Sequence, residues 1–275
     1  MPRMCKESVV TTLDLTVRYY PDSTPAGVAC REENFRRREI PMPIPVSETA
    51  LVLVDIWNTH FIESWRERAE QVTTAAIGPA LEAARQAGLT IIHAPSMRVA
   101  QQYHQDQRYQ SASDGLPASA PEWPPEAFRS RTGPYAVYRN PRNQAPVRPP
   151  HWAAQLEMSP YIEVQDGEAV VATGDELHAL LQDRRALHLI YVGFATNWCV
   201  LAKDYGIRAM NERGYNTILL RDATMGVEFP DTLDALQATE IAVREVEQQH
   251  GFSASNRDFL AACRAVSGHV PQPDG

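Results

Sequence analysis

A cysteine in the second half of the chain has the sequence context of a nucleophile. Residues 187–192 form an apolar run, Gly193 and a short polar turn follow, and Cys199 stands at the start of a predicted helix. The N-terminus of a helix presents unpaired N–H groups and the positive end of the dipole, which lower the pKa of a thiol and populate the reactive thiolate. The same N–H groups stabilise the oxyanion that forms when a thiolate attacks a carbonyl. A buried structural cysteine is the alternative interpretation.

A carboxylate in the first half of the chain follows a similar apolar run. Residues 51–54 are Leu-Val-Leu-Val, which is typical of a strand buried on both faces, and Asp55 comes directly after them. In open α/β sheets the ligand crevice lies outside the carboxyl ends of the strands, so we expect Asp55 and Cys199 to meet at one edge. A carboxylate beside a thiol accepts its proton and so activates the nucleophile. The alternative for Asp55 is a helix N-cap after the strand.

The elements that must position these two residues alternate between strand and helix. Alanines at helical spacing over residues 72–87, with Gly88 as the C-cap, precede a predicted strand at 89–93. After Cys199 the pattern predicts a helix, a strand and two further helices, at residues 201–213, 216–220, 232–249 and 256–265. Strands that alternate with helices predict a parallel sheet with right-handed crossovers.

Together these segments resemble the isochorismatase-like cysteine hydrolases. The resemblance rests on the strand that ends in Asp55 and on a match to the family's Gly-x-x-Thr-x-x-Cys-Val segment, formed here by Gly193, Thr196, Cys199 and Val200. It covers roughly residues 48–100 and 165–250. It implies an α/β fold in three layers (α/β/α), with a doubly wound, mostly parallel sheet flanked by helices. It also implies hydrolysis of a C–N bond in a small amide, ureide or imide through a thioester.

The resemblance implies a role for each matching residue. Asp55 would be the general base and Cys199 the nucleophile, while the backbone N–H groups of Thr196 and Cys199 would form the oxyanion hole. The family's non-proline cis peptide would fall between Ala195 and Thr196. The resemblance to amide hydrolases implies no cofactor.

One catalytic residue of the family has no counterpart in this sequence. The family's lysine follows a strand in a Val-x-Lys pattern, but the matching residues 168–177 contain no lysine, and the chain has only Lys6 and Lys203. Arginine stays protonated and does not replace a proton-shuttling lysine. The candidates for a replacement are weak: Arg139, Arg142 and His178.

Three alternatives stay open: an altered hydrolase, an enzyme that needs only the Asp–Cys pair, or a non-catalytic member that binds a small molecule or a protein. A vinyl-ether hydrolase ranks last, because such members retain the lysine.

Three large side chains near the reactive pair are predicted to bind the substrate. They are Trp57, which replaces the family's usual Gln two residues after the aspartate, together with His60 and Trp198. Core packing is the alternative for both tryptophans. His60, His93 and Asp55 raise the question of a metal site, but the Asp-x-His pattern of metal-binding relatives is absent beside His93, so we predict none.

Composition limits the class of protein. With 275 residues, of which 44% are hydrophobic, the chain has the length for one large α/β domain with insertions. A net charge of −8 argues against nucleic acid as a partner, because phosphate binding needs a basic face. The scattered cysteines and the absence of an apolar leader or a long apolar run predict a cytoplasmic protein with reduced thiols and no membrane contact. We expect a small-molecule substrate and a homo-oligomer.

We divide the chain into an N-terminal extension at residues 1–48 and a hydrolase domain at 49–268. The extension contains a predicted strand within residues 8–20 and is expected to cross the surface or reach a neighbouring subunit. Residues 97–165 form an insertion rich in proline and aromatic residues. Proline disfavours regular structure, but a disordered linker would be poor in aromatics, so we expect an ordered, irregular excursion that covers the crevice or builds a subunit contact.

Overall fold

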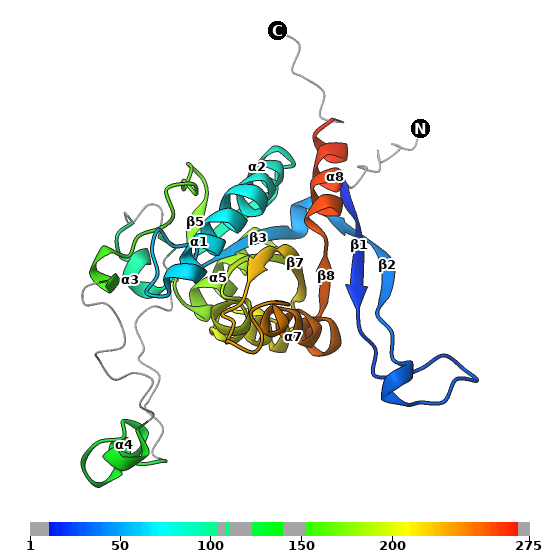
Figure 1. Cartoon of the computed structure of the whole chain (residues 1–275). Coiled ribbons are helices and arrows are strands. Elements are labelled where there is room, and N and C mark those ends of the chain that lie inside the picture. The colour runs from blue at the N-terminus through cyan, green and yellow to red at the C-terminus, as the bar shows by residue number, and fades with distance from the viewer. Residues whose placement is uncertain (1–10, 104–107, 110–122, 140–151, 269–275) are drawn as a thin grey trace, which may run out of the picture.

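The strands of the chain form one sheet in the computed structural model, which describes residues 11–103, 108–109, 123–139 and 152–268 (Figure 1). The strands are β1 (Thr12–Tyr19), β2 (Arg38–Pro45), β3 (Thr49–Val54), β4 (Thr90–Ala94), β5 (Ala169–Val170), β6 (His188–Phe194), β7 (Asn216–Met225) and β8 (Phe252–Ala254). Their order is β2-β1-β8-β7-β6-β3-β4-β5. Neighbours from β8 to β5 are parallel, whereas β1 is antiparallel to β2 and β8. The predicted mostly parallel, doubly wound sheet is confirmed.

Helices cover both faces of this sheet (Figure 1). One face carries α1 (Glu63–Val72), α2 (Gly78–Gln86) and α8 (Asn256–Ser267). The other carries α5 (Gly174–Arg184), α6 (Ile207–Glu212) and α7 (Gln237–Glu245). Shorter helices are α3 (Met97–Ala100), α4 (Glu126–Arg129), η1 (Glu32–Asn34), η2 (Val46–Glu48), η3 (Thr73–Ile77), η4 (Gly133–Tyr138), η6 (Trp152–Gln155), η7 (Thr196–Val200) and η8 (Val246–His250). No helix among the described residues has the length and apolar character needed to cross a membrane.

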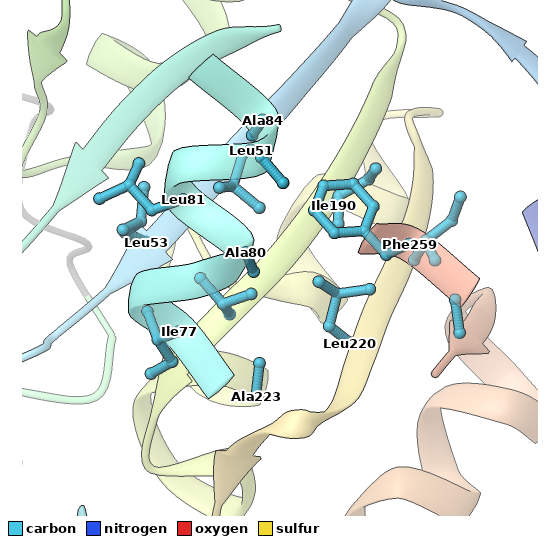
Figure 2. Packing of buried hydrophobic residues seen from close by; sticks show 14 of the residues in the cluster. Leu51, Leu53, Ile77, Ala80, Leu81, Ala84, Ile190, Leu220, Ala223 and Phe259 are labelled. Carbon is cyan, nitrogen blue, oxygen red and sulfur yellow. The ribbon is translucent and has the colours of Figure 1, made fainter. Parts of the chain in front are cut away.

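The central strands are buried on both faces, and their side chains alternate between two cores. Leu51 and Leu53 of β3 pack under α2, while Ala50 and Val52 of the same strand belong to the core on the opposite face. Figure 2 shows the first core, in which the α2 side chain of Leu81 lies over the strands. Because both faces are covered, these strands are apolar at most positions, which is why they can be recognised in the sequence.

The N-terminal extension is part of the same sheet. Every second residue of β1 points into the core, and Leu13, Leu15 and Val17 are fully buried. β1 pairs with β2 along its whole length and with β8 at Val17. Residues 12–45 therefore close one edge of the sheet and pack against α8.

Three predicted helices begin at different residues from those expected or are interrupted. The predicted helix at 72–87 begins earlier, because α1, η3 and α2 follow one another from Glu63. The predicted helix at 201–213 is interrupted by a turn, and α6 starts only at Ile207. The predicted helix at 232–249 starts at Gln237, since residues before it form turns that leave Leu233 and Leu236 exposed.

The chain changes direction across the sheet between β3 and β6. From β3 it proceeds outward through β4 to β5, and it then returns to β6 and proceeds the other way through β7 to β8. Such a switch point opens a crevice at the carboxyl ends of the two central strands. Asp55 follows β3 and the Cys199 segment follows β6, so the topology brings both to this crevice.

Candidate active site

Asp55 leaves the end of β3 in an unusual backbone conformation. Its φ is 45°, in the left-handed region that residues other than glycine rarely adopt. Neighbouring β6 approaches very closely here: a Cβ on Gly193 would stand 2.0 Å from the carbonyl oxygen of Val54. The sequence therefore needs glycine at 193, and the two strands meet backbone to backbone just before the reactive residues.

Cys199 lies in η7, a wide helical turn held by side-chain hydrogen bonds. The amide of Asn197 bonds to both backbone groups of Val227, with its Nδ2 donating to the carbonyl and its Oδ1 accepting from the N–H, each at 2.9 Å. The Thr196 hydroxyl lies 2.7 Å from the Thr224 hydroxyl, which itself donates to the Gly193 carbonyl oxygen. These bonds tie the turn to the loop after β7 and to the end of β6.

A non-proline cis peptide does precede this turn, but it lies one bond earlier than predicted. It joins Phe194 to Ala195, and not Ala195 to Thr196. The strand β6 ends at Phe194, and the carbonyl of Ala195 already belongs to the turn, because it accepts from the N–H groups of Trp198 and Val200.

Burial dominates the electrostatics of the pair. It raises the pKa of Asp55 to about 6, although the Cys199 thiol, the Lys203 charge, the Ser96 N–H and the Trp57 indole each lower it. Neither Asp55 oxygen has a partner with full hydrogen-bond geometry among the described residues, so these donors only approach it.

The prediction of a lowered thiol pKa is wrong. Burial raises the pKa of Cys199 well above its usual range, and the negative charge of Asp55 raises it further. Lys203 and the N–H of Ala195 oppose this shift without overcoming it. The resting pair is therefore a thiol beside a carboxylate that is mostly ionised at neutral pH, and the thiolate forms only when Asp55 takes the proton.

A cavity of about 180 Å³ opens above the pair. Among the described residues its lining consists of Asp55, Trp57, His60, Phe61, Trp65, Trp152, Phe194, Ala195, Trp198 and Cys199. All three predicted substrate-binding residues, Trp57, His60 and Trp198, are thus among its walls. Trp198 is 40% exposed and stands at its rim, whereas His60 is buried.

The rings of the cavity wall contact one another around His60. The His60 ring lies 4.3 Å from the Trp65 ring and 4.2 Å from the Phe61 ring, centroid to centroid. Its Nδ1 accepts from the N–H of Ile62 at 3.1 Å, so the proton of the neutral ring lies on Nε2. A packed aromatic wall of this kind is rigid, because each ring is held by its neighbours.

Trp152 reaches the cavity from the far end of the proline-rich insertion. The chain around Met158 forms a bridge with Trp57. The Asn58 N–H donates to the Glu157 carbonyl oxygen, and the Asn58 Oδ1 accepts from the Glu157 N–H. This pairing seats the end of the insertion beside the segment after β3, and the Trp152 ring lies 5.1 Å from the Phe61 ring. Part of the insertion therefore covers the crevice; residues 104–107, 110–122 and 140–151 lie outside the described residues.

Two of the weak candidates for a replacement lysine, Arg139 and His178, are not at this site. Arg139 is exposed and donates to the carbonyl of Arg131. His178 lies on α5 and bonds to the Tyr215 hydroxyl at 2.8 Å. Arg142 lies outside the described residues.

His93 has a partner other than a metal. Its Nε2 lies 2.8 Å from a Glu168 oxygen, and Arg85 donates to the same carboxylate. Burial alone would raise the pKa of Glu168, but the hydrogen bonds from His93 and Arg85 hold it at about 2. The described residues contain no group of three or more His, Cys, Asp or Glu side chains arranged to hold a metal ion.

Several residues of the cavity lie outside the set predicted from sequence. Trp65 comes from α1, where no element was predicted before residue 72, and its indole N–H donates to the Gly226 carbonyl oxygen at 3.2 Å. Phe194 ends β6, whose other positions are almost all apolar and buried, so no pattern distinguishes it from core. For Trp152, the only indication in the sequence was that the insertion is rich in aromatic residues.

Comparisons with known proteins identify one family and several solved structures with a similar fold. A family model of the isochorismatase domain matches residues 49–250. A similar solved structure is a cysteine hydrolase from Pseudomonas syringae pv. phaseolicola, 20% identical, with a TM-score of 0.51 over 82% of this chain and 96% of that chain. Others are an isochorismatase family protein from Burkholderia thailandensis (18% identical, TM-score 0.48, 79% and 96% covered) and an isochorismatase from Pseudomonas putida (20%, 0.47, 77% and 90%). A comparison with curated proteins finds no match.

The identities to solved structures are low and bear on the fold alone. The family model, in contrast, spans most of the sequence, including both strands that end at the reactive pair. The chain therefore belongs to the isochorismatase family of hydrolases.

Proposed function

We propose that this protein is a cysteine hydrolase that cleaves a C–N bond of a small amide, ureide or imide-like substrate through a thioester. The observation that carries the proposal is the contact of Asp55 with Cys199 at the base of a cavity. A buried carboxylate whose pKa is raised to about 6 is still mostly ionised at neutral pH, and it is basic enough to accept a proton from a thiol under attack.

The reaction would proceed in two halves. In the first, the Cys199 proton moves to Asp55, the sulfur forms a bond to the substrate carbonyl carbon, and the carbonyl π electrons move to oxygen. The tetrahedral intermediate then collapses, the C–N bond breaks, and the leaving nitrogen takes the proton from Asp55. In the second half, water gives a proton to Asp55 and its oxygen attacks the thioester. The C–S bond breaks, and the sulfur recovers its proton.

The turn η7 would supply the oxyanion hole. The N–H groups of Trp198 and Val200 both bond to the carbonyl of Ala195, so they are already used. We assign the oxyanion to the N–H groups of Thr196 and Cys199, which belong to the same turn. Two fixed N–H donors in a site sheltered from water stabilise a developing negative charge strongly.

The cavity walls favour a substrate with a flat, uncharged acyl group. The walls are formed mainly by aromatic rings, and no Lys or Arg side chain is among the described residues that line it. A substrate carboxylate would lose its hydration there without gaining a cationic partner, which costs several kcal/mol or more. We therefore propose a small aromatic carboxamide that stacks against Trp57, Trp152 and Trp198.

The test is turnover of a panel of amides, ureides and imides by wild type and by Cys199→Ala, with Cys30→Ala as the matched control. Cys30 is exposed, so its loss should leave activity unchanged. Mass spectrometry of the protein during turnover should detect an acyl group on Cys199. Equal activity in wild type and Cys199→Ala contradicts the proposal. Absence of turnover across the panel, with no acyl group detected on Cys199, favours a non-catalytic binding protein.

A further inference from the structure

The buried carboxylate of Asp55 needs a positive charge nearby if it is to stay ionised. It is 2% exposed, and neither of its oxygens has a partner with full hydrogen-bond geometry among the described residues. Removing an unpaired carboxylate from water is costly, and the usual result is that the group keeps its proton. A protonated Asp55 could not accept the proton of Cys199. The site therefore calls for a cation that acts on Asp55 without occupying the substrate cavity.

Lys203 has this position. Its backbone N–H donates to the carbonyl oxygen of Cys199 at 3.2 Å, so the two residues are four apart along one helical turn and their side chains share a face. The ammonium lies 5.8 Å from the centroid of the buried Tyr205 ring. The charges of Asp55 and Cys199 raise the pKa of that same Tyr205, which burial already raises, so its ring is close to the pair as well.

The ammonium is not neutralised by another acid. Among the described residues no carboxylate lies within ion-pair distance of the Lys203 ammonium, although Asp204 is its neighbour in sequence. Its charge lowers the pKa of both Asp55 and Cys199. It is also the one lysine in the described part of the chain, since Lys6 lies outside it.

The turn that carries Lys203 is held by residues 168–177, the segment in which the family's lysine has no counterpart. Asp204 points away from the site and its Oδ2 accepts from the N–H of Gly174 at 2.7 Å. Gly174 is the first residue of α5 and follows the short connection from β5, within residues 168–177. The connection between β5 and α5 thus holds one side of the turn. The hydroxyl of Tyr191 holds another side by donating to the Tyr205 carbonyl oxygen at 3.0 Å.

We infer that Lys203 is a positioning residue of the Asp55–Cys199 pair, and that its ammonium keeps the Asp55 carboxylate ionised and balances the negative charge that moves to the sulfur during attack. The inference rests on the proposed function for its role in turnover. Lys203 is not among the residues that line the cavity, so it acts through Asp55 and Cys199 and leaves the substrate untouched. Lys203, on the same helical turn as the nucleophile, would thus supply the positive charge that the family's lysine supplies from the segment after β5, where this sequence has no lysine.

The test compares Lys203→Met, which removes the charge at similar length, with Lys203→Arg, which keeps it. Arg208→Met is the matched control, because it removes a positive charge from the same segment but one that pairs with Glu245 on α7. For each variant kcat/KM is measured across pH, and alkylation of Cys199 by iodoacetamide is followed by peptide mass spectrometry, which needs no substrate. Melting curves check that each variant folds.

For Lys203→Met we expect the pKa of Asp55 to rise by about one unit, so that kcat/KM falls about tenfold at pH 5 but only about twofold at pH 7. The acid limb of its pH profile should move to higher pH, and alkylation of Cys199 should slow. Lys203→Arg should recover most of both, and Arg208→Met should behave as wild type. The inference is overturned if Lys203→Met keeps the wild-type profile and alkylation rate, or if Lys203→Arg is as impaired as Lys203→Met. If alkylation depends on Lys203 but no amide is turned over, the inference stands and the proposed function fails.

Discussion

Gly193 packs directly against Val54, with a Cβ position only 2.0 Å from the Val54 carbonyl oxygen. The two residues are register partners in the parallel pairing of β6 with β3. Val54 ends β3, immediately before Asp55, and Gly193 is the next-to-last residue of β6, shortly before the turn that carries Cys199. The separation of carboxylate and thiol is therefore set by this backbone contact.

We predict that Gly193→Ala abolishes most activity and lowers the free energy of unfolding by about 3 kcal/mol or more, because the methyl group overlaps backbone and the φ of 113° disfavours any side chain. Gly214→Ala is the control, since Gly214 has a similarly positive φ but no atom within 4 Å of a Cβ. It should cost about 1 kcal/mol and leave kcat/KM unchanged. Urea denaturation and turnover measure both effects. Equal destabilisation of the two variants would show that the contact with Val54 is unimportant.

The pH profile of turnover should report the protonation of Asp55. Only the carboxylate accepts the thiol proton, so kcat/KM for an uncharged amide should rise with pH through about 6. No further rise is expected up to pH 9, because the pKa of Cys199 is raised and the thiolate is not preformed. The profile is measured between pH 4.5 and 9. Activity that continues to increase steadily above pH 8 would indicate attack by a free thiolate.

Asp55→Asn should make the protein more stable at neutral and alkaline pH while it removes activity. In wild type the pKa of Asp55 rises from 3.8 to about 6 on folding, so the folded state binds the proton more tightly. The contribution of Asp55 protonation to the free energy of unfolding is therefore fully present below pH 3.8. It is lost as the pH rises through 6, by about 3 kcal/mol in all. The variant lacks this decline. Denaturation at pH 8 and pH 4.5 measures the difference, which should be large at pH 8 and small at pH 4.5; a difference independent of pH would contradict the raised pKa.

Trp152 should contribute to substrate binding and little to chemistry. Trp152→Ala removes one ring of the cavity wall, so we expect KM for an aromatic amide to increase about three- to tenfold with kcat nearly unchanged. Trp123→Ala is the matched control from the same insertion, since Trp123 is 79% exposed. Steady-state kinetics distinguishes the two. Identical KM values would place Trp152 outside the substrate site.

The sequence predicted the fold because the central strands are apolar on both faces. Residues 51–54 and 187–192 needed no tertiary information to be recognised as buried strands, and the order of helices and strands then allowed few topologies. Helix boundaries were less certain. The turn between Cys199 and α6 bends to bring Asp204 to Gly174, a contact between segments distant in sequence that no local pattern encodes.

Within the site, the sequence by itself determined that Asp55 and the Cys199 turn follow strands that end at one edge of the sheet, because parallel strands place their carboxyl ends together. Only the tertiary structure decided the state of the thiol. A helix start favours a thiolate, but the burial of Cys199 and the charge of Asp55 outweigh that local effect. Tertiary structure likewise decided that Trp152 lines the cavity and that Lys203 does not. The positions of both residues depend on packing between segments far apart along the chain.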